Sequence, residues 1–192
     1  MALSEHPAER HHQVAGHFGE VAGAVTDWTA PAPVPDWTAR DVVAHLVDWF
    51  PGFLSGGGIT LTPISVSVAD DPAAAWAAHT AAVQRLFDHG DREFVHPMAG
   101  THRVADAIDR FYTSDIFMHT WDLAKAGGIE PALDPDFAGM LLAGMQPIDE
   151  MLRASGQYGP KMPVSTDAPV PDQLMAFVGR DPDWSPEGTH LR

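Results

Sequence analysis

Apolar residues recur at three- and four-residue intervals along most of this chain, which is the pattern of amphipathic helices. In residues 7–26 the recurrence builds one stripe, made of Val14, Phe18, Val21, Ala22 and Val25. The proline-rich run over residues 31–35 cannot continue a helix, because each proline lacks a backbone donor. The pattern therefore predicts a core-facing helix over residues 7–26 that ends before these prolines.

A second helix is predicted over residues 39–54. Thr38 is suited to cap it, with Asp41 as the carboxylate partner of a capping box, and the glycines at 56–58 end it. Pro51 lies late in this span and predicts a kink or an early end. Residues 55–71 read as a loop, and their partial alternation leaves two alternatives open, a short strand or a packed lid.

Further helices are predicted over residues 72–89, 104–126 and 135–154. Asp70 or Asp71 caps the first, Gly127 stops the second, and Pro147 interrupts the third. The third is expected to pack Phe137, Met140, Leu141, Met145, Ile148 and Leu152. Residues 90–102 are expected to form a connector. A short helix over 172–178 precedes a tail, residues 180–192, that is docked or frayed.

These elements predict an all-α fold, in which a four-helix bundle carries an additional C-terminal helix and an irregular tail. The 192 residues contain no internal repeat and no linker, so a single domain over 1–192 is expected. Hydrophobic residues make up 45% and charged residues 19%, as in globular proteins. No apolar run is long enough to cross a membrane, and no signal peptide is recognisable, so a cytoplasmic location is the default expectation.

Charge and cysteine content exclude several classes of function. The net charge of −15, with only 11 Lys and Arg spread along the chain, argues against nucleic-acid binding. The absence of cysteine excludes disulfides, thiolate metal sites and a cysteine nucleophile, so any thiol chemistry would need a thiol from outside. The sequence contains no phosphate-binding loop, GxGxxG pattern or Ser-His-Asp arrangement.

The strongest chemical signal is the pair Asp115 and His119, four residues apart in a predicted helix, so that both side chains lie on one face. His45 on the second helix supplies another imidazole. Together they offer two nitrogens and one oxygen to a divalent metal and leave positions for water or substrate. The alternative is that the two histidines are hydrogen-bonded core residues, and that an arginine from another helix compensates Asp115.

Other residues near these positions are assigned supporting roles. Asp122 is expected to hydrogen-bond His119 and set which ring nitrogen is free, or else to bond the backbone. Trp49, one turn after His45, is the candidate to line a cofactor pocket. His11, His12 and His17 are expected on the surface of the first helix, and His79 and His89 have no carboxylate at useful spacing. The loop histidines His96 and His102 either approach the site or are ordinary loop residues.

Three stretches and Trp28 resemble the actinobacterial metal-binding family related to mycothiol-dependent maleylpyruvate isomerase, one of the wider DinB-like helical bundles. The stretches are PAPVPDWTARDVVAHLV at 31–47, DIFMHTWDLAKAG at 115–127 and LMAFVGRDPDW at 174–184. The resemblance implies a DinB-like four-helix bundle that binds zinc through His45, Asp115 and His119. It also implies mycothiol as a cofactor. In the isomerase the carboxylate ligand is glutamate, whereas this chain has the shorter aspartate.

Two hypotheses of function follow. In the first, the protein is a metal-dependent, mycothiol-using transferase or isomerase, in which the metal holds a small-molecule thiol as thiolate for attack on an electrophilic substrate. In the second, it is a non-catalytic metal-binding or ligand-binding module. One version of this hypothesis is a homodimer formed through the faces of the bundle. Zinc is the expected metal, and the donor set also suits nickel or iron.

Overall fold

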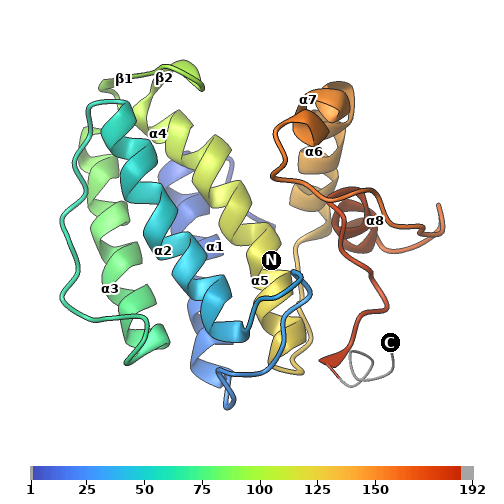
Figure 1. Ribbon diagram of the computed structural model, residues 1–192. Helices are drawn as coiled ribbons and strands as arrows, with labels where there is room; N and C mark the ends of the chain where they lie inside the picture. Colours follow the sequence, from blue (N-terminus) through green and yellow to red (C-terminus); the bar gives the residue numbers. More distant parts are fainter. Residues whose placement is uncertain (1, 187–192) are drawn as a thin grey trace.

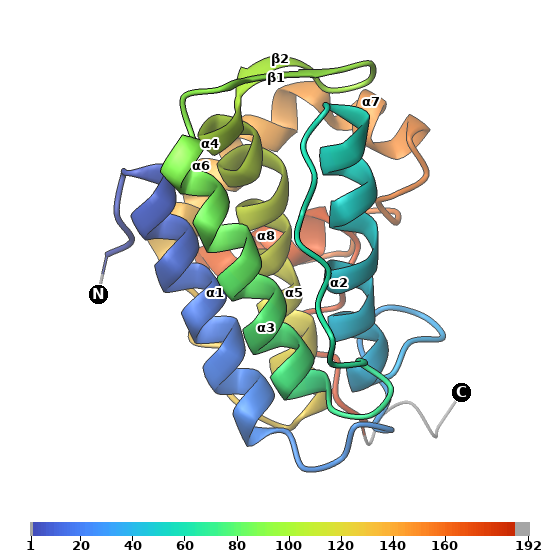
Figure 2. The ribbon, with the colours of Figure 1, turned by 90° about the vertical axis from the view of Figure 1, so that its left-hand side faces the viewer.

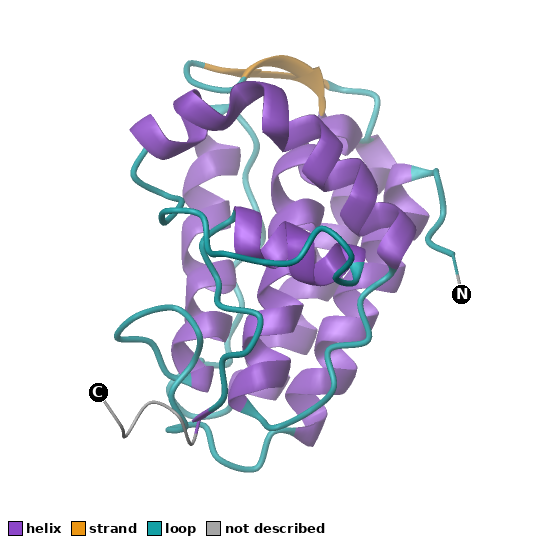
Figure 3. Cartoon of the chain, turned by 90° about the vertical axis from the view of Figure 1, so that its right-hand side faces the viewer, coloured by secondary structure: helices purple, strands orange, loops and turns teal. Residues whose placement is uncertain are grey.

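The computed structural model describes residues 2–186, and these residues are mostly helical (Figure 1, Figure 3). The expectation of a helical fold is confirmed in this sense, although a small two-stranded sheet is also present. The long helices α1 (Pro7–Ala24), α2 (Ala39–Gly56) and α3 (Pro72–Gln84) lie side by side with the segment 104–126 (Figure 2). α1 and α2 each contact both α3 and α5 (Ser114–Ala126), so the four segments enclose one core. Its fully buried large side chains include Phe18, Leu46, Phe50, Trp76, Tyr112 and Ile116.

Helix starts follow the predicted capping residues. The Thr38 side chain accepts a hydrogen bond from the Asp41 backbone N–H, and the Asp41 carboxylate accepts one from the Thr38 N–H at 2.8 Å, which completes the capping box. Asp71 caps α3 by accepting from Ala74 N–H at 2.9 Å. Pro51 lies inside α2 without ending it, because the missing N–H removes a single bond and the helix continues to Gly56.

The connector predicted over residues 90–102 is wrong in part, since it forms a β-hairpin. After the 3-10 helix η1 (Arg85–His89), strand β1 (Glu93–His96) pairs antiparallel with β2 (Gly100–Arg103). Phe94 anchors β1 with a fully buried ring that contacts Gly57, where a Cβ atom would lie 2.0 Å from the ring. The hairpin therefore depends on a glycine far from it in sequence, which local patterns cannot show.

Of the two alternatives for residues 55–71, the short strand is wrong, and the packed lid stays a prediction, supported by the packing of this segment. No strand forms there, and Ile59 and Leu61 are buried against the core. In the C-terminal region, the prediction that Met140 is packed is wrong, because its side chain is 51% exposed. Ile148 is 36% exposed.

The helix predicted over 104–126 is continuous but not uniform. It consists of α4 (Val104–Ala107), the π-helical segment η2 (Ile108–Thr113) and α5. A π-helical turn contains an additional residue, and such turns occur often at functional sites. Here η2 ends at Thr113, two residues before Asp115, and its additional residue shifts the helical phase of the side chains that follow in α5.

The C-terminal helices pack beside α5 and away from α3 (Figure 1). α6 (Pro135–Met145), the 3-10 turn η3 (Gln146–Ile148) and α7 (Asp149–Ala154) show the predicted interruption at Pro147, and α8 (Val170–Phe177) contacts α6. Phe117 of α5 meets Phe137 of α6 with ring centroids 4.9 Å apart. The tail is docked where Lys125 donates to the Pro182 carbonyl at 3.1 Å. Residues 187–192 lie outside the described residues. Within residues 2–186 no helix is both long and apolar enough to cross a membrane.

Candidate metal centre

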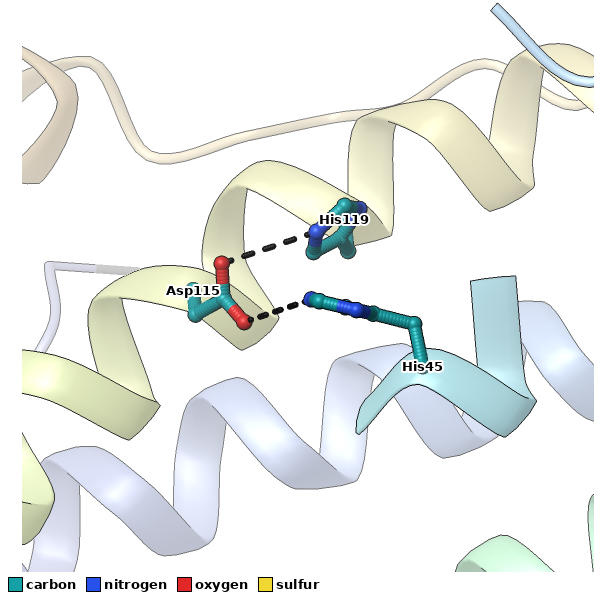
Figure 4. A group of neighbouring side chains, drawn as sticks. All are labelled: His45, Asp115 and His119. Carbon is teal, nitrogen blue, oxygen red and sulfur yellow. Dashed lines mark hydrogen bonds and ion pairs between the residues drawn. The ribbon is translucent and has the colours of Figure 1, made fainter. Parts of the chain in front are cut away.

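His45 of α2 and the pair Asp115 and His119 of α5 converge on one point (Figure 4). His45 Nε2 lies 3.3 Å from Asp115 Oδ2, and His119 Nε2 lies 3.5 Å from Asp115 Oδ1. One ligand atom from each residue lies within 4.8 Å of the other two. The structure thus brings together all three residues that the sequence analysis assigned to a metal, from two helices 70 residues apart.

These separations can be compared with those around a tetrahedral ion. Zn–N and Zn–O bonds are about 2.0–2.2 Å long, so neighbouring donor atoms in a tetrahedron lie roughly 3.3–3.6 Å apart. Each histidine nitrogen lies at such a distance from one oxygen of Asp115, His45 Nε2 from Oδ2 and His119 Nε2 from Oδ1. One donor from each residue would leave a fourth position of a tetrahedral ion open.

The three candidate ligands differ in exposure. The His45 side chain is 32% exposed and that of Asp115 21%, whereas that of His119 is 7% exposed. The site is therefore covered on the α5 side and reaches solvent on the α2 side. A small molecule entering this site would meet His45 and Asp115 first.

Trp49 contacts the site differently from the expectation. Its indole N–H donates to Asp115 Oδ2 at 3.0 Å, so it holds a candidate ligand carboxylate in place. Its ring also lies 6.2 Å from the His45 ring, beside the open part of the site. The predicted role of Trp49 in binding a cofactor remains a prediction, to which the structure adds a contact with the carboxylate.

Asp122 is completely buried and accepts a hydrogen bond at Oδ2 from His119 Nδ1, 2.8 Å away. Arg180, which follows α8, donates through Nε to Oδ1 at 3.2 Å and through Nη2 to Oδ2 at 2.9 Å. Burial alone would raise the pKa of Asp122, but Arg180 and the His119 contact outweigh it and lower the pKa to about 2. An ionised carboxylate only accepts, so the nitrogen of His119 that donates to Asp122 is Nδ1, and Nε2 is the nitrogen that faces the site.

Charge in this region is not balanced by basic side chains. Burial would raise the pKa of Asp115, but the charges of His119 and His45 and the hydrogen bonds from His45 and Trp49 hold it below its ordinary value. Among the described residues, the guanidinium bonded to this cluster is that of Arg180, and its hydrogen bonds go to Asp122, not Asp115. The charge of Arg180 also reaches Asp115, and a protonated imidazole or a bound cation beside Asp115 would balance the second negative charge.

Trp37, Arg180 and Tyr158 also belong to the surroundings of the site, although the sequence pattern predicted no role there for them. The Trp37 ring lies 5.0 Å from the His45 ring and 5.7 Å from that of His119, where it covers both imidazoles. In the sequence, Arg180 appears only within the stretch at 174–184 that carries part of the family resemblance. Burial and the negative charge of Asp115 raise the pKa of the Tyr158 phenol, so that residue also lies near the carboxylate. All three come from loops or the C-terminal region, which helical periodicity does not describe.

The remaining histidines divide into exposed and buried residues. The expectation that His11 is on the surface is wrong, because its side chain is fully buried against Thr113 and the ring of Phe87. It lies three, four and seven residues before Val14, Ala15 and Phe18, on the predicted apolar stripe, so periodicity could have found it.

The other histidines differ less from expectation. His12 is exposed as predicted, whereas His17 is partly buried and bonds the Pro131 carbonyl at 2.9 Å. His79 is buried beside Tyr112, with ring centroids 5.8 Å apart. His96 and His102 lie in the hairpin and bond residues of its own turn, Met98, Ala99 or both.

Comparison with known proteins gives one family match. Residues 10–56 match the family described as the mycothiol maleylpyruvate isomerase N-terminal domain. This segment holds α1, α2 and His45, whereas Asp115 and His119 lie outside it. Two uncharacterized proteins of Mycobacterium tuberculosis, from strains CDC 1551 and H37Rv, are each 29% identical to this chain in an alignment 160 residues long. The alignment covers 78% of this chain and 83% of theirs. No solved structure matches the chain significantly.

Proposed function

We propose that this chain, whose residues 10–56 match the mycothiol maleylpyruvate isomerase N-terminal domain family, binds a divalent metal through His45 Nε2, His119 Nε2 and the Asp115 carboxylate. The observation that carries the proposal is the convergence of one donor atom from each of the three residues, all within 4.8 Å of one another. Zinc fits the donor set best, and nickel and iron are the alternatives. We also infer that α1, α2, α3 and residues 104–126 form a DinB-like four-helix bundle around it.

The charge of the site supports the same proposal. Asp115 is held in the ionised form without a hydrogen bond from an arginine or lysine among residues 2–186. A partly buried carboxylate in this state is stabilised strongly by a cation. The hydrogen bond from His119 Nδ1 to Asp122 leaves Nε2 as the nitrogen that faces Asp115 and His45, as a metal ligand requires.

We further propose that the protein is a mycothiol-dependent transferase or isomerase. A bound zinc ion would favour deprotonation of a thiol at its open position and hold it as thiolate. His45 and Trp49 border the accessible part of the site and would receive the thiol and the electrophilic substrate. The absence of cysteine is consistent with a sulfur nucleophile supplied from outside.

Metal binding is tested by elemental analysis of the purified protein and by competition with a chromophoric zinc chelator. The wild type is expected to bind one zinc ion. His45→Ala and His119→Ala are expected to lose at least a hundredfold in affinity, whereas the matched surface variant His12→Ala keeps wild-type affinity. Unchanged affinity in both site variants would overturn the proposed site.

Catalysis is tested separately, by following thiol consumption with mycothiol and a panel of electrophiles that includes activated aryl halides and maleylpyruvate. Turnover that is lost on chelation and in His45→Ala would support the enzyme. Turnover that survives complete removal of metal would contradict it. Tight metal binding with no turnover of any member of the panel would instead favour a non-catalytic metal-binding module.

A further inference from the structure

Arg180 connects the C-terminal helices to the candidate metal centre. Its guanidinium reaches both oxygens of Asp122, at 3.2 Å from Nε and 2.9 Å from Nη2. Oδ2 of the same carboxylate takes the hydrogen bond from His119 Nδ1 at 2.8 Å. A chain of side chains therefore runs from the segment after α8, through Asp122, to the most buried candidate ligand.

We propose that Arg180 is a positioning residue for the metal centre, which fixes the plane of the Asp122 carboxylate and through it the orientation and tautomer of His119. This inference rests on the proposed metal binding. An imidazole can carry its proton on either nitrogen, and its ring can turn about its side-chain bonds. Holding Nδ1–H against a carboxylate that is itself held at both oxygens leaves Nε2 facing Asp115 and His45.

The planar guanidinium is suited to this role. Its parallel N–H donors match the two oxygens of a carboxylate, and a lysine in its place would offer a single point charge. The Asp122 side chain is completely buried and that of Arg180 is 14% exposed, so water competes little for these hydrogen bonds. The pair is therefore both directional and shielded.

The position of Arg180 depends on the C-terminal region. Gly179, with φ of +98°, turns the chain after α8, and a Cβ atom there would lie 3.0 Å from the Gly159 backbone. Arg180 N–H bonds the Met175 carbonyl at 2.8 Å, and Arg153 bonds the carbonyls of Phe177 and Gly159. The segment before α8 and the last residue of α8 are thus tied to α7, and Arg180 follows directly from this framework.

Zinc affinity, measured by chelator competition, tests the inference in the full-length protein. Arg180→Gln is expected to weaken zinc binding by about 10- to 100-fold, the usual effect of losing a group that orients a ligand. Arg180→Lys is expected to fall between this variant and the wild type. Arg110→Gln removes an exposed arginine, with the same change in net charge, and is expected to bind within about twofold of wild type.

The His119 tautomer supplies a readout that a merely structural role would not change. In the chelator-treated wild type, long-range nitrogen–proton correlation spectra are expected to show His119 as the Nδ1–H form. Arg180→Gln is expected to show a mixture of forms. The wild-type spectrum alone reports the tautomer of His119, so the proposal can be refuted even if Arg180→Gln folds poorly.

The two proposals fail in different ways. If the wild type binds no divalent metal, the proposed metal centre is wrong. If the wild type binds zinc and Arg180→Gln binds it as tightly, or if wild-type His119 is the Nε2–H form, the role of Arg180 is wrong and the metal centre stands.

Discussion

Acid is expected to destabilise this protein through two buried histidines that lie apart from the metal centre. His11 and His79 are at most 1% exposed, and the Nε2 atom of each has no hydrogen-bond partner among the described residues. Burial, reinforced by the neighbouring His79 and His12, lowers the pKa of His11 from 6.5 to about 3. Burial likewise lowers the pKa of His79 from 6.5 to about 4.

The direction of the effect follows from proton linkage. Both folded-state pKa values lie below the unfolded value of 6.5, so the folded protein keeps these imidazoles neutral while the unfolded chain takes up protons. Their full contribution to stability is present above pH 6.5 and is lost as the pH falls from 6.5 toward 4. Each histidine costs about 1.4 kcal/mol per pH unit in this window, so at pH 4.5 the two together cost roughly 5 kcal/mol.

Urea unfolding followed by circular dichroism at pH 7.5, 6.5, 5.5 and 4.5, with a chelator present, measures this loss. His11→Asn and His79→Phe should each reduce the loss of unfolding free energy between pH 6.5 and 4.5 by about 2 to 3 kcal/mol, whatever their stability at pH 7.5. His89→Asn is the matched control, since it removes an exposed imidazole that does not contribute to the pKa shifts of His11 and His79. A double variant that loses as much stability as the wild type in this window would refute the reasoning. Asp122, with a pKa of about 2, changes the unfolding free energy mainly below pH 4, outside the range from pH 6.5 to 4.5.

Three other predictions concern single side chains. Trp49→Phe removes the N–H that holds Asp115 and should weaken zinc binding by about 10-fold or more in chelator competition, with helix content unchanged. Thr38→Ala removes the α2 cap and should lower the free energy of unfolding by about 1 kcal/mol in urea, with an unchanged value arguing against the capping box. Phe50→Ala empties a fully buried site stacked 3.7 Å from Tyr112 and should cost about 3–5 kcal/mol in the same assay, against less than about 0.5 kcal/mol for the exposed Met140→Ala. A cost near zero for Phe50→Ala would mean that the core is not packed as described.

The helices of this protein could be predicted from its sequence because their causes are local. The spacing of apolar residues, the caps at Thr38 and Asp71, and Gly127 after α5 act within a few residues of each helix. The same local geometry places Asp115 and His119 on one face of α5, so two of the three candidate ligands are a property of one helix. The burial of His11 belongs with these features, since the stripe of α1 already includes it.

Only the tertiary structure decided the contacts between segments that lie far apart in the chain. The meeting of His45 with Asp115 spans 70 residues, and that of Arg180 with Asp122 spans 58. The hairpin depends on Phe94 packing against Gly57, and Trp37 covers the site from a loop. Helix propensity and capping act within about one turn, whereas these contacts depend on how whole helices pack, on the π-helical turn that rotates α5, and on the glycine turn that presents Arg180. The sequence by itself therefore determined which side chains could bind a metal, and the packing of the helices determined that they point at one another.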